Sequence, residues 1–575
     1  MSLTTENIGK ANRHFLKSDF SVTSWDDLKP YYENLISRTI NSKEDLIEWL
    51  LDRSELESAL QENLAWRYIR MSCDNTNEKL QQDYNYYVRE IDPNISPEDN
   101  KLNEKFIACP FSELLSETDY RNYLRNVKQR ISLFRKENIP LLAELAEKQQ
   151  LFGQISGAQT ITYNNQEHTL QQASVWLKNT DRAIRETVYK KITARRLEDK
   201  KQLDDLYTNL IQLRHQVALN AGFKNFRDYS FAALERFDYS VEDCYRFHES
   251  IELEIKPVIN QLEEYRKTKL DVAHLMPWDL AVDPTGKPPI KPFSNTQEMV
   301  EKTILCLKEI DPEFANCITL LDEMNRFDLD SRKGKSPGGY NYPLYETGVP
   351  FIFMNSTGQL RDLVTMVHES GHAVHAVLAH NLPFHEMRSC PSEVAELASM
   401  SMELLTMEHW HYFISDEKEL KRAKLEHLTS LIEILPWIAI VDAFQQWVYL
   451  HPEHSVTERE QLFVQLYNRF SGSVVDWQGF ENVKENLWQK QIHIFDSPFY
   501  YIEYGMAQLG AIALWKNYKT DATATIRNYK KALALGYTKS IGEIYKAAGV
   551  SFDFSATYIK ELSQFVQSEI KELQK

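Results

Sequence analysis

Apolar residues recur at a helical spacing over most of this chain of 575 residues, and charged residues fill the positions between them. A period near 3.6 residues is typical of amphipathic helices, whereas half-buried strands alternate with a period of two. We therefore predict a mainly α-helical protein. Long helical segments are expected over residues 115–150, 168–220, 240–271 and 295–326.

Two stretches break the helical pattern. Residues 157–170 alternate around an Asn-Asn pair and predict a β-hairpin. Residues 331–361 contain a segment rich in Gly, Pro and Tyr, then a strand near residues 349–355, then the start of a helix. We expect this strand to be an edge strand that pairs with a peptide substrate, the alternative being that the preceding segment is only a connecting loop.

The bulk properties exclude some classes of partner. A formal net charge of −17 argues against nucleic acid or an anionic membrane surface as the main partner. The six cysteines lack CxxC spacing and the N-terminus lacks a signal-peptide pattern, so we expect a cytoplasmic protein with reduced thiols. Residues 431–450 are apolar but contain Glu433, Pro436 and Asp442, which predicts a pair of buried helices and not a membrane span.

Residues 368–372 read His-Glu-Ser-Gly-His. On a helix, positions i and i+4 share a face and lie about 6 Å apart along the axis, so His368 and His372 can bind one metal ion. Glu369 then lies beside the metal, where its carboxylate can take a proton from a metal-bound water. The flanking residues are apolar and contain no proline, which favours a helix. A chance match on an ordinary helix is the alternative.

A catalytic zinc ion usually has three protein ligands and a water, so this pair needs a third ligand. The metzincin class would need a histidine at the position of Leu378, and is excluded. His375 lies on nearly the same face as His372, and we interpret it as a packing residue or as a support for a ligand. The candidates are His375, His380, Glu386, Glu393 and Glu396.

We favour Glu396 as the third ligand. It lies in the apolar run VAELASM, where an unpaired carboxylate would be costly. Ser392 resembles a helix N-cap, and Glu393 in the first turn is then explained by the helix dipole. Glu403, seven residues after Glu396 on the same face, can accept a hydrogen bond from the outer nitrogen of a ligating histidine.

An aromatic group follows much later in the chain. His493 precedes the segment SPFYYIEYG, in which Tyr500, Tyr501 and Tyr504 lie close together. Tyrosines at helical spacing are usually packing residues, and this is the alternative for each of them. Beside a histidine in a metallopeptidase, a phenol can instead donate a hydrogen bond to the oxyanion of a tetrahedral intermediate.

The order of these motifs resembles the thimet oligopeptidase and oligoendopeptidase F family of zinc peptidases. It comprises a GGY loop, a PFIFMN strand, TMVHESGHAVH, VAELASMSME and FYYIEYG, and the resemblance is specific over about residues 330–550. It implies a large helical ellipsoid with a deep central channel and one zinc ion at the channel floor. We also expect an N-terminal helical region, residues 1–190, and a catalytic domain, residues 191–575, that line the same channel.

Carried over by motif, the resemblance implies that His368, His372 and Glu396 bind zinc and that Glu369 is the general base. The family usually has a small or apolar residue where this chain has Ser370. That side chain should point away from zinc, so we expect a change in packing and no loss of activity.

The resemblance also matches His493, Tyr500 and Tyr504 to a segment that supplies transition-state contacts. We therefore predict a zinc-dependent endopeptidase that hydrolyses internal bonds of short peptides by attack of a zinc-bound water. An exopeptidase such as a dipeptidyl carboxypeptidase is the alternative, although the sequence places no fixed charge for a terminal carboxylate. A peptide-binding protein with a degenerate site is a further alternative. Such a protein would lack a metal ligand or Glu369, and all of these residues are present. Short peptides are the predicted partners, and the sequence indicates no oligomeric state.

Overall fold

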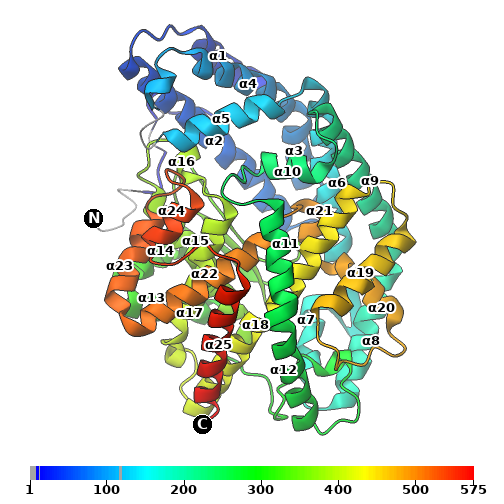
Figure 1. The fold of residues 1–575 in the computed structure, drawn as a ribbon. Helices are drawn as coiled ribbons and strands as arrows, with labels where there is room; N and C mark the ends of the chain where they lie inside the picture. Colours follow the sequence, from blue (N-terminus) through cyan, green and yellow to red (C-terminus); the bar gives the residue numbers. More distant parts are fainter. Residues whose placement is uncertain (1–7, 12, 116–119) are drawn as a thin grey trace.

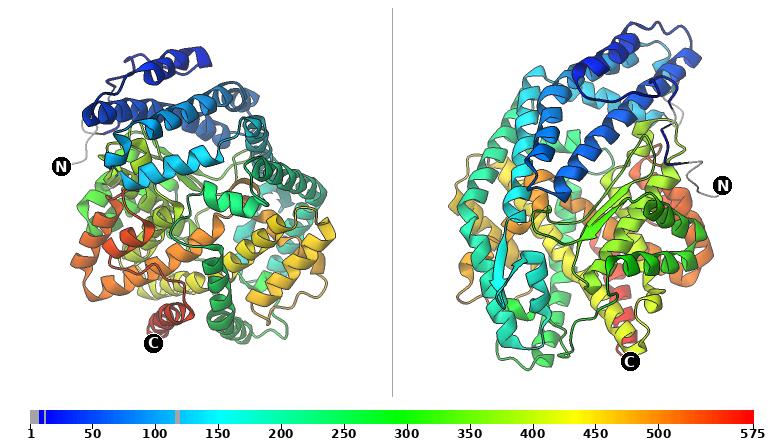
Figure 2. Two further views of the ribbon diagram at one scale, coloured as in Figure 1. Left: turned by 45° about the horizontal axis from the view of Figure 1, so that its top comes forward. Right: turned by 180° about the vertical axis from the view of Figure 1, so that it is seen from behind.

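The computed structural model describes residues 8–11, 13–115 and 120–575, and it confirms a mainly helical protein. The helices form one elongated body, with a small sheet and a hairpin between them (Figures 1 and 2). Of the predicted segment 115–150, residues 116–119 lie outside the described part of the chain.

The predicted helical segments are helical but divided. In the segment 295–326, α13 (Thr296–Ile310) ends before Asp311, and α14 (Pro312–Glu323) begins at Pro312. Proline has no backbone N–H to continue a helix, but it fits the first turn of a new one. The Asp311 carboxylate caps this turn by accepting a hydrogen bond from the Glu313 backbone N–H at 2.9 Å.

Four of the first five helices share a hydrophobic core of their own, to which the third contributes no residue. Phe384 and Met387, from the short helix α16 (His385–Arg388) and the residue before it, join this core from much later in the chain. The predicted boundary near residue 190 stays a prediction. The five helices are α1 (Trp25–Ser37), α2 (Lys43–Cys73), α3 (Glu78–Tyr86), α4 (Asp92–Ala108) and α5 (Arg121–Leu133).

Most of the remaining helices pack around one larger core, in which α17 packs against both α15 and α22, whereas α7 and α8 form a smaller core with the hairpin. The helices of the middle part are α6 (Ile139–Gly157), α7 (Leu170–Ser174), α8 (Arg182–Glu198), α9 (Lys200–Asn220), α10 (Phe226–Ala233), α11 (Val241–Ser250) and α12 (Lys256–Lys269). Those of the last part are α15 (Leu360–Ala379), α17 (Ser392–Met407), α18 (Glu417–Leu450), α19 (Val456–Phe470), α20 (Glu481–Glu485), α21 (Ile492–Asp496), α22 (Tyr501–Thr520), α23 (Ala522–Leu533), α24 (Ile541–Ala547) and α25 (Ala556–Leu573).

The two predicted β elements are present. The strands β1 (Thr160–Tyr163) and β2 (Gln166–Thr169) form an antiparallel hairpin, whose turn residues Asn164 and Asn165 have positive φ angles of 51° and 61°. The hairpin and the second sheet are both visible from behind in Figure 2.

The strand before the HESGH helix was predicted to be an edge strand, and this is wrong. The strand β5 (Phe351–Ser356) is the central strand of a three-stranded sheet, parallel to β3 (Phe327–Asp330) and antiparallel to β4 (Tyr340–Tyr342). The edge strands are β3 and β4, and β4 comes from the Gly/Pro/Tyr-rich segment itself.

The apolar region 431–450 was predicted to be a pair of helices, but it lies within the single helix α18, which continues through Pro436. By length and composition α18 could cross a membrane, yet 67% of its most apolar window is buried inside the protein. This burial agrees with the prediction of a core helix.

A cavity of about 1150 Å³ lies between the N-terminal helices and the later part of the chain. Its wall includes Tyr68 of α2, Tyr84 of α3 and Gln149 of α6 on one side, and His368 of α15 and Tyr500 on the other. We call this cavity the channel. Both the N-terminal and the later helices therefore line it.

Candidate metal centre and active site

The helix α15 carries the HESGH pentad and packs directly on α17. The approach is closest at Gly371, where an added Cβ would lie 2.6 Å from Ser399 Cα and 2.7 Å from the Ala398 carbonyl oxygen. Only glycine fits this contact. Because α17 comes so near, Glu396 lies beside the two histidines of α15.

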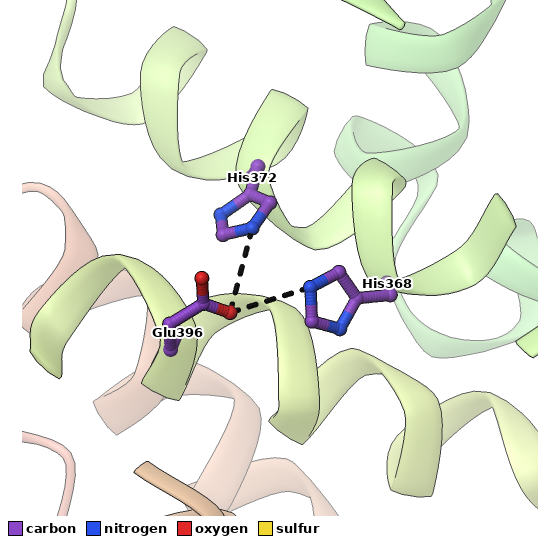
Figure 3. Close-up of side chains that lie close together, drawn as sticks. All are labelled: His368, His372 and Glu396. Carbon is purple, nitrogen blue, oxygen red and sulfur yellow. Dashed lines mark ion pairs between the residues drawn. The ribbon is translucent and has the colours of Figure 1, made fainter. Parts of the chain in front are cut away.

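The three predicted ligands converge on one point (Figure 3). Glu396 Oε2 lies 3.3 Å from His368 Nε2 and 3.6 Å from His372 Nε2, and the three donor atoms all lie within 4.8 Å of one another. Tetrahedral ligands at 2.0–2.1 Å from zinc are separated by about 3.3–3.4 Å. Two neutral imidazoles and one carboxylate therefore fit a catalytic zinc ion in both type and spacing.

A carboxylate behind His368 fixes the orientation of its ring. His368 Nδ1 hydrogen-bonds Glu403 Oε1 at 2.7 Å, which leaves Nε2 directed at Glu396. This is the arrangement predicted for Glu403. His427 of α18, which the sequence analysis missed, lies 3.6 Å from the other oxygen of Glu403.

Burial and charge together set the pKa values in the site. Burial disfavours the charged form of His368, but hydrogen bonds to Glu396 and Glu403 outweigh it and raise the pKa of His368 well above its usual value. Burial lowers the pKa of His372 to about 4. Burial also acts against ionised Glu396, yet the two histidines and Tyr500 hold its pKa at about 2. A carboxylate that stays ionised in a buried site is suited to a cation.

Glu369 has a different environment from Glu396. Its side chain is 5% exposed, and its Oε2 atom has no hydrogen-bond partner in the described residues. Burial raises the pKa of Glu369 to about 7. A carboxyl group with a pKa near neutral and one oxygen that lacks a hydrogen-bond partner can both accept and return a proton.

Three of the four alternative ligands have hydrogen-bond or ion-pair partners, and the fourth, His380, has a buried Nδ1 atom without a partner among the described residues. Cys390 Sγ lies 3.1 Å from His375 Nε2, and Tyr239 donates to Glu393 at 2.6 Å. Arg130 binds Glu386 through both carboxylate oxygens, and His380 packs against Gly348. Glu393 lies in the first turn of α17 as predicted, but the N-cap of α17 is Pro391 and not Ser392.

The late aromatic group lies against the same site. Tyr500 donates to Glu396 Oε1 at 2.5 Å, and the Tyr504 hydroxyl lies 3.3 Å from His493 Nε2. Gln491 hydrogen-bonds the other ring nitrogen of His493 at 2.7 Å, and burial lowers the pKa of His493. The seven predicted site residues therefore line one cavity of about 400 Å³. Their roles stay predictions.

The strand β4 also lines this cavity. The sequence had suggested that β5, the next strand, would be the one that contacts the substrate. Tyr340 and Asn341 line it, and the Asn341 side chain donates to the Glu369 backbone oxygen at 3.3 Å. Ser370, where the chain departs from the family pattern, is fully buried and donates to the Met366 carbonyl oxygen at 2.7 Å. It does not line the cavity.

Comparisons with known proteins agree with the predicted family and fold. The sequence model of peptidase family M3 matches residues 175–564, and that of the M3 N-terminal domain matches residues 15–134. An oligoendopeptidase F homologue of Borreliella burgdorferi is 23% identical over 533 residues, which cover 88% of this chain and 84% of that protein. The structure of PZ peptidase A with an inhibitor aligns with a TM-score of 0.92 and 23% identity, covering 97% of this chain and 99% of that one. Oligoendopeptidase F from Enterococcus faecium aligns with a TM-score of 0.64 and 18% identity, covering 96% and 97%.

Proposed function

This chain belongs to peptidase family M3, and from that premise we propose that it is a zinc-dependent endopeptidase that cuts internal bonds of short peptides in the cytoplasm. One observation carries the proposal. Glu369, a buried residue whose Oε2 atom has no hydrogen-bond partner among the described residues, lines the same cavity as His368, His372 and Glu396. A base and a metal site so close together are suited to hydrolysis.

The proposed metal is one zinc ion per chain, held by His368, His372 and Glu396. When bound, zinc would polarise the scissile carbonyl and lower the pKa of a water at the site towards about 7. Glu403 keeps His368 in the tautomer that presents Nε2.

Glu369 moves the proton in the proposed reaction. Its carboxylate takes a proton from the attacking water and then gives it to the leaving amine. A pKa of about 7 suits both transfers, because neither the charged nor the neutral form is strongly favoured near neutral pH.

The phenols act where negative charge develops on the carbonyl oxygen. Tyr504 lies beside His493 and is free to donate to that oxygen, whereas Tyr500 already donates to Glu396. We assign Tyr504 to the oxyanion, and Tyr500 to the orientation of the ligand carboxylate.

The edge of β4 is proposed to hold the substrate backbone. One side of β4 pairs with β5, and no strand in the described chain pairs with its other side. Tyr340 and Asn341 line the cavity that contains Glu369. An extended peptide can add to this edge as a further strand.

The test combines metal content with product analysis. Protein loaded with zinc is incubated with peptides whose ends are either free or blocked, and the products are identified by mass spectrometry. We expect cleavage of internal bonds in both sets, whereas cleavage only of free-ended peptides at a fixed distance from an end would favour an exopeptidase.

The variant Glu369→Gln tests the base. It should retain zinc and peptide binding but lose nearly all turnover, because an amide cannot accept the proton. Ser370→Ala is the matched control on the same helix, since Ser370 is buried away from the cavity. Turnover of Glu369→Gln near that of Ser370→Ala would refute the assignment.

A further inference from the structure

A second cavity, of about 610 Å³, adjoins the channel, and we call it the side cavity. None of the seven predicted site residues lines it. It lies among α8, α12, α18 and α19, of which α8 and α19 are at the right of Figure 1 and α18 is nearer its middle. Its volume falls within the range of pockets that bind small ligands, about 300–1,000 Å³.

The side cavity and the channel meet at a shared wall. Gln171, Pro337, Gly338, Glu433 and Ile492 line both. Ile492 is the residue before His493, and Gly338 is the residue before Gly339, which lies next to Glu369. A peptide in the channel can therefore extend towards the side cavity.

Two cations line the side cavity without a counterion. Neither Arg196 of α8 nor Lys490, between α20 and α21, makes an ion pair or a side-chain hydrogen bond with any described residue. Arg195, one position earlier, contrasts with them, since it binds the Asp199 carboxylate at 2.7 Å. The Lys490 ammonium lies 4.7 Å from the centre of the Trp437 ring.

The two cations also act on each other. Lys490 is exposed to solvent by its surface area, but desolvation by the surrounding residues still lowers the pKa of its ammonium to about 8, and the nearby Arg196 guanidinium acts in the same direction. Burial likewise lowers the pKa of Arg196. Two repelling charges in a partly enclosed, aromatic-walled space are stabilised when an anion lies between them.

Two glutamates also line the side cavity, and neither makes an ion pair with Arg196 or Lys490 in the described part of the chain. Burial raises the pKa of Glu263 to about 7 and also raises that of Glu433. Arg266 lowers the pKa of both. These glutamates therefore interact with Arg266, and Arg196 and Lys490 are left for a ligand.

We propose that Arg196 and Lys490 form a subsite that binds a carboxylate of the peptide substrate, at a distance from the bond that is cut. The inference rests on the proposed peptidase function. The carboxylate can be the α-carboxylate of the peptide or the side chain of an Asp or Glu residue, since both present two oxygens to an arginine and a lysine. Trp437 and Tyr467 supply apolar wall for the neighbouring part of the peptide.

The test compares four versions of one cleavable peptide. Two versions have a free C-terminus and two have an amidated one, and each pair contains one peptide with Glu and one with Gln at the same internal position. The comparison is repeated with this position moved along the peptide. For the parent protein we expect one of the two carboxylates to lower KM by about 10-fold or more, the usual effect of a charge-assisted hydrogen bond. If the α-carboxylate is bound, cleavage lies at a constant distance from the C-terminus. If the side chain is bound, cleavage follows the Glu.

Variants then connect this preference to the two cations. Arg196→Gln and Lys490→Met should reduce the KM ratio between acidic and neutral peptides towards one, whereas Lys490→Arg should preserve it. The controls are Arg195→Gln and Lys484→Met. Lys484 also lies over aromatic rings, 4.8 Å from that of Tyr467, but does not line the side cavity.

The outcomes separate the two proposals. If the parent cleaves peptides but shows the same KM for all four versions, or if Arg196→Gln and Lys490→Met keep the full preference, the subsite is refuted and the peptidase function stands. If no peptide is cleaved by the zinc-loaded protein, the proposed function fails and the subsite fails with it. Thermal unfolding of each variant identifies any that fail to fold, and Lys490→Arg then decides the question for Lys490.

Discussion

The closest contact between α15 and α17 allows a sharp test at Gly371. Alanine in the middle of a helix is more favourable than glycine by about 1 kcal/mol, so helix propensity alone predicts that Gly371→Ala stabilises the protein. Packing predicts the opposite. The added Cβ would lie 2.6 Å from Ser399 Cα, whereas ordinary contact begins at 3.4 Å, and the obstacle is backbone that cannot rotate away.

The helices must therefore separate by about 0.8 Å, and such overpacking usually costs about 1–3 kcal/mol. Together with the gain in propensity, we expect Gly371→Ala to be destabilised by up to about 2 kcal/mol. The same displacement moves Glu396 away from His368 and His372. Ligand distances tolerate only about 0.2 Å, so zinc affinity should fall by about 10-fold or more.

The assays are urea unfolding of the metal-free protein and competition for zinc with a chromophoric chelator. Gly542→Ala is the matched control, because Gly542 lies in α24 and a Cβ there meets no atom within 4 Å. It should be neutral or stabilised by up to about 1 kcal/mol, with unchanged zinc affinity. If Gly371→Ala behaves in the same way as Gly542→Ala, the packing argument is wrong.

Three further predictions concern single side chains of the site. Glu396→Gln should lose zinc, whereas Glu393→Gln should retain it because Tyr239 is its partner; metal analysis after dialysis distinguishes them, and the reverse pattern would exchange the two assignments. Tyr504→Phe should lower kcat by about 10²–10³ with little change in KM, whereas Tyr500→Phe should weaken zinc binding because its hydroxyl bonds Glu396. A Tyr504→Phe variant within about threefold of the parent kcat, or a Tyr500→Phe variant with the parent's zinc affinity, would return that residue to a packing role. In the metal-free protein, burial raises the pKa of Glu369 from 4.5 to about 7, so ionisation of this carboxyl group lowers the stability of the fold as the pH rises through this range. Glu369→Gln should therefore raise Tm at pH 8 and leave it nearly unchanged at pH 4. An equal shift of Tm at both pH values would contradict the role of Glu369 ionisation.

The sequence analysis succeeded where local spacing decides the structure. The i, i+4 pair of His368 and His372 needs only a helix, and the placement of Glu396 and Glu403 follows from their seven-residue separation on the next long helix. The hairpin of β1 and β2 was predictable because its partners are adjacent and its turn residues are Asn.

The prediction failed where contacts between distant segments of the chain determine the structure. The strand β5 is central because β3 pairs with it from more than twenty residues earlier, which no local pattern indicates. The hydrogen bond between Tyr500 and Glu396 joins residues 104 positions apart. Pro436 favoured a break in the helix, but burial of α18 on neighbouring helices keeps it continuous through the proline.

The length of α2 has a consequence for the mechanics of the protein. This helix has 31 residues, or about 46 Å at 1.5 Å per residue, and it belongs to two separate cores. Its first half is buried among the N-terminal helices. Its second half packs on the sheet, where Ser72 hydrogen-bonds the Tyr340 hydroxyl at 2.6 Å and the Tyr68 ring contacts those of Tyr340 and Tyr342. A rigid rod held at both ends transmits tilt, so any rotation of the N-terminal helices also displaces the exposed edge of β4.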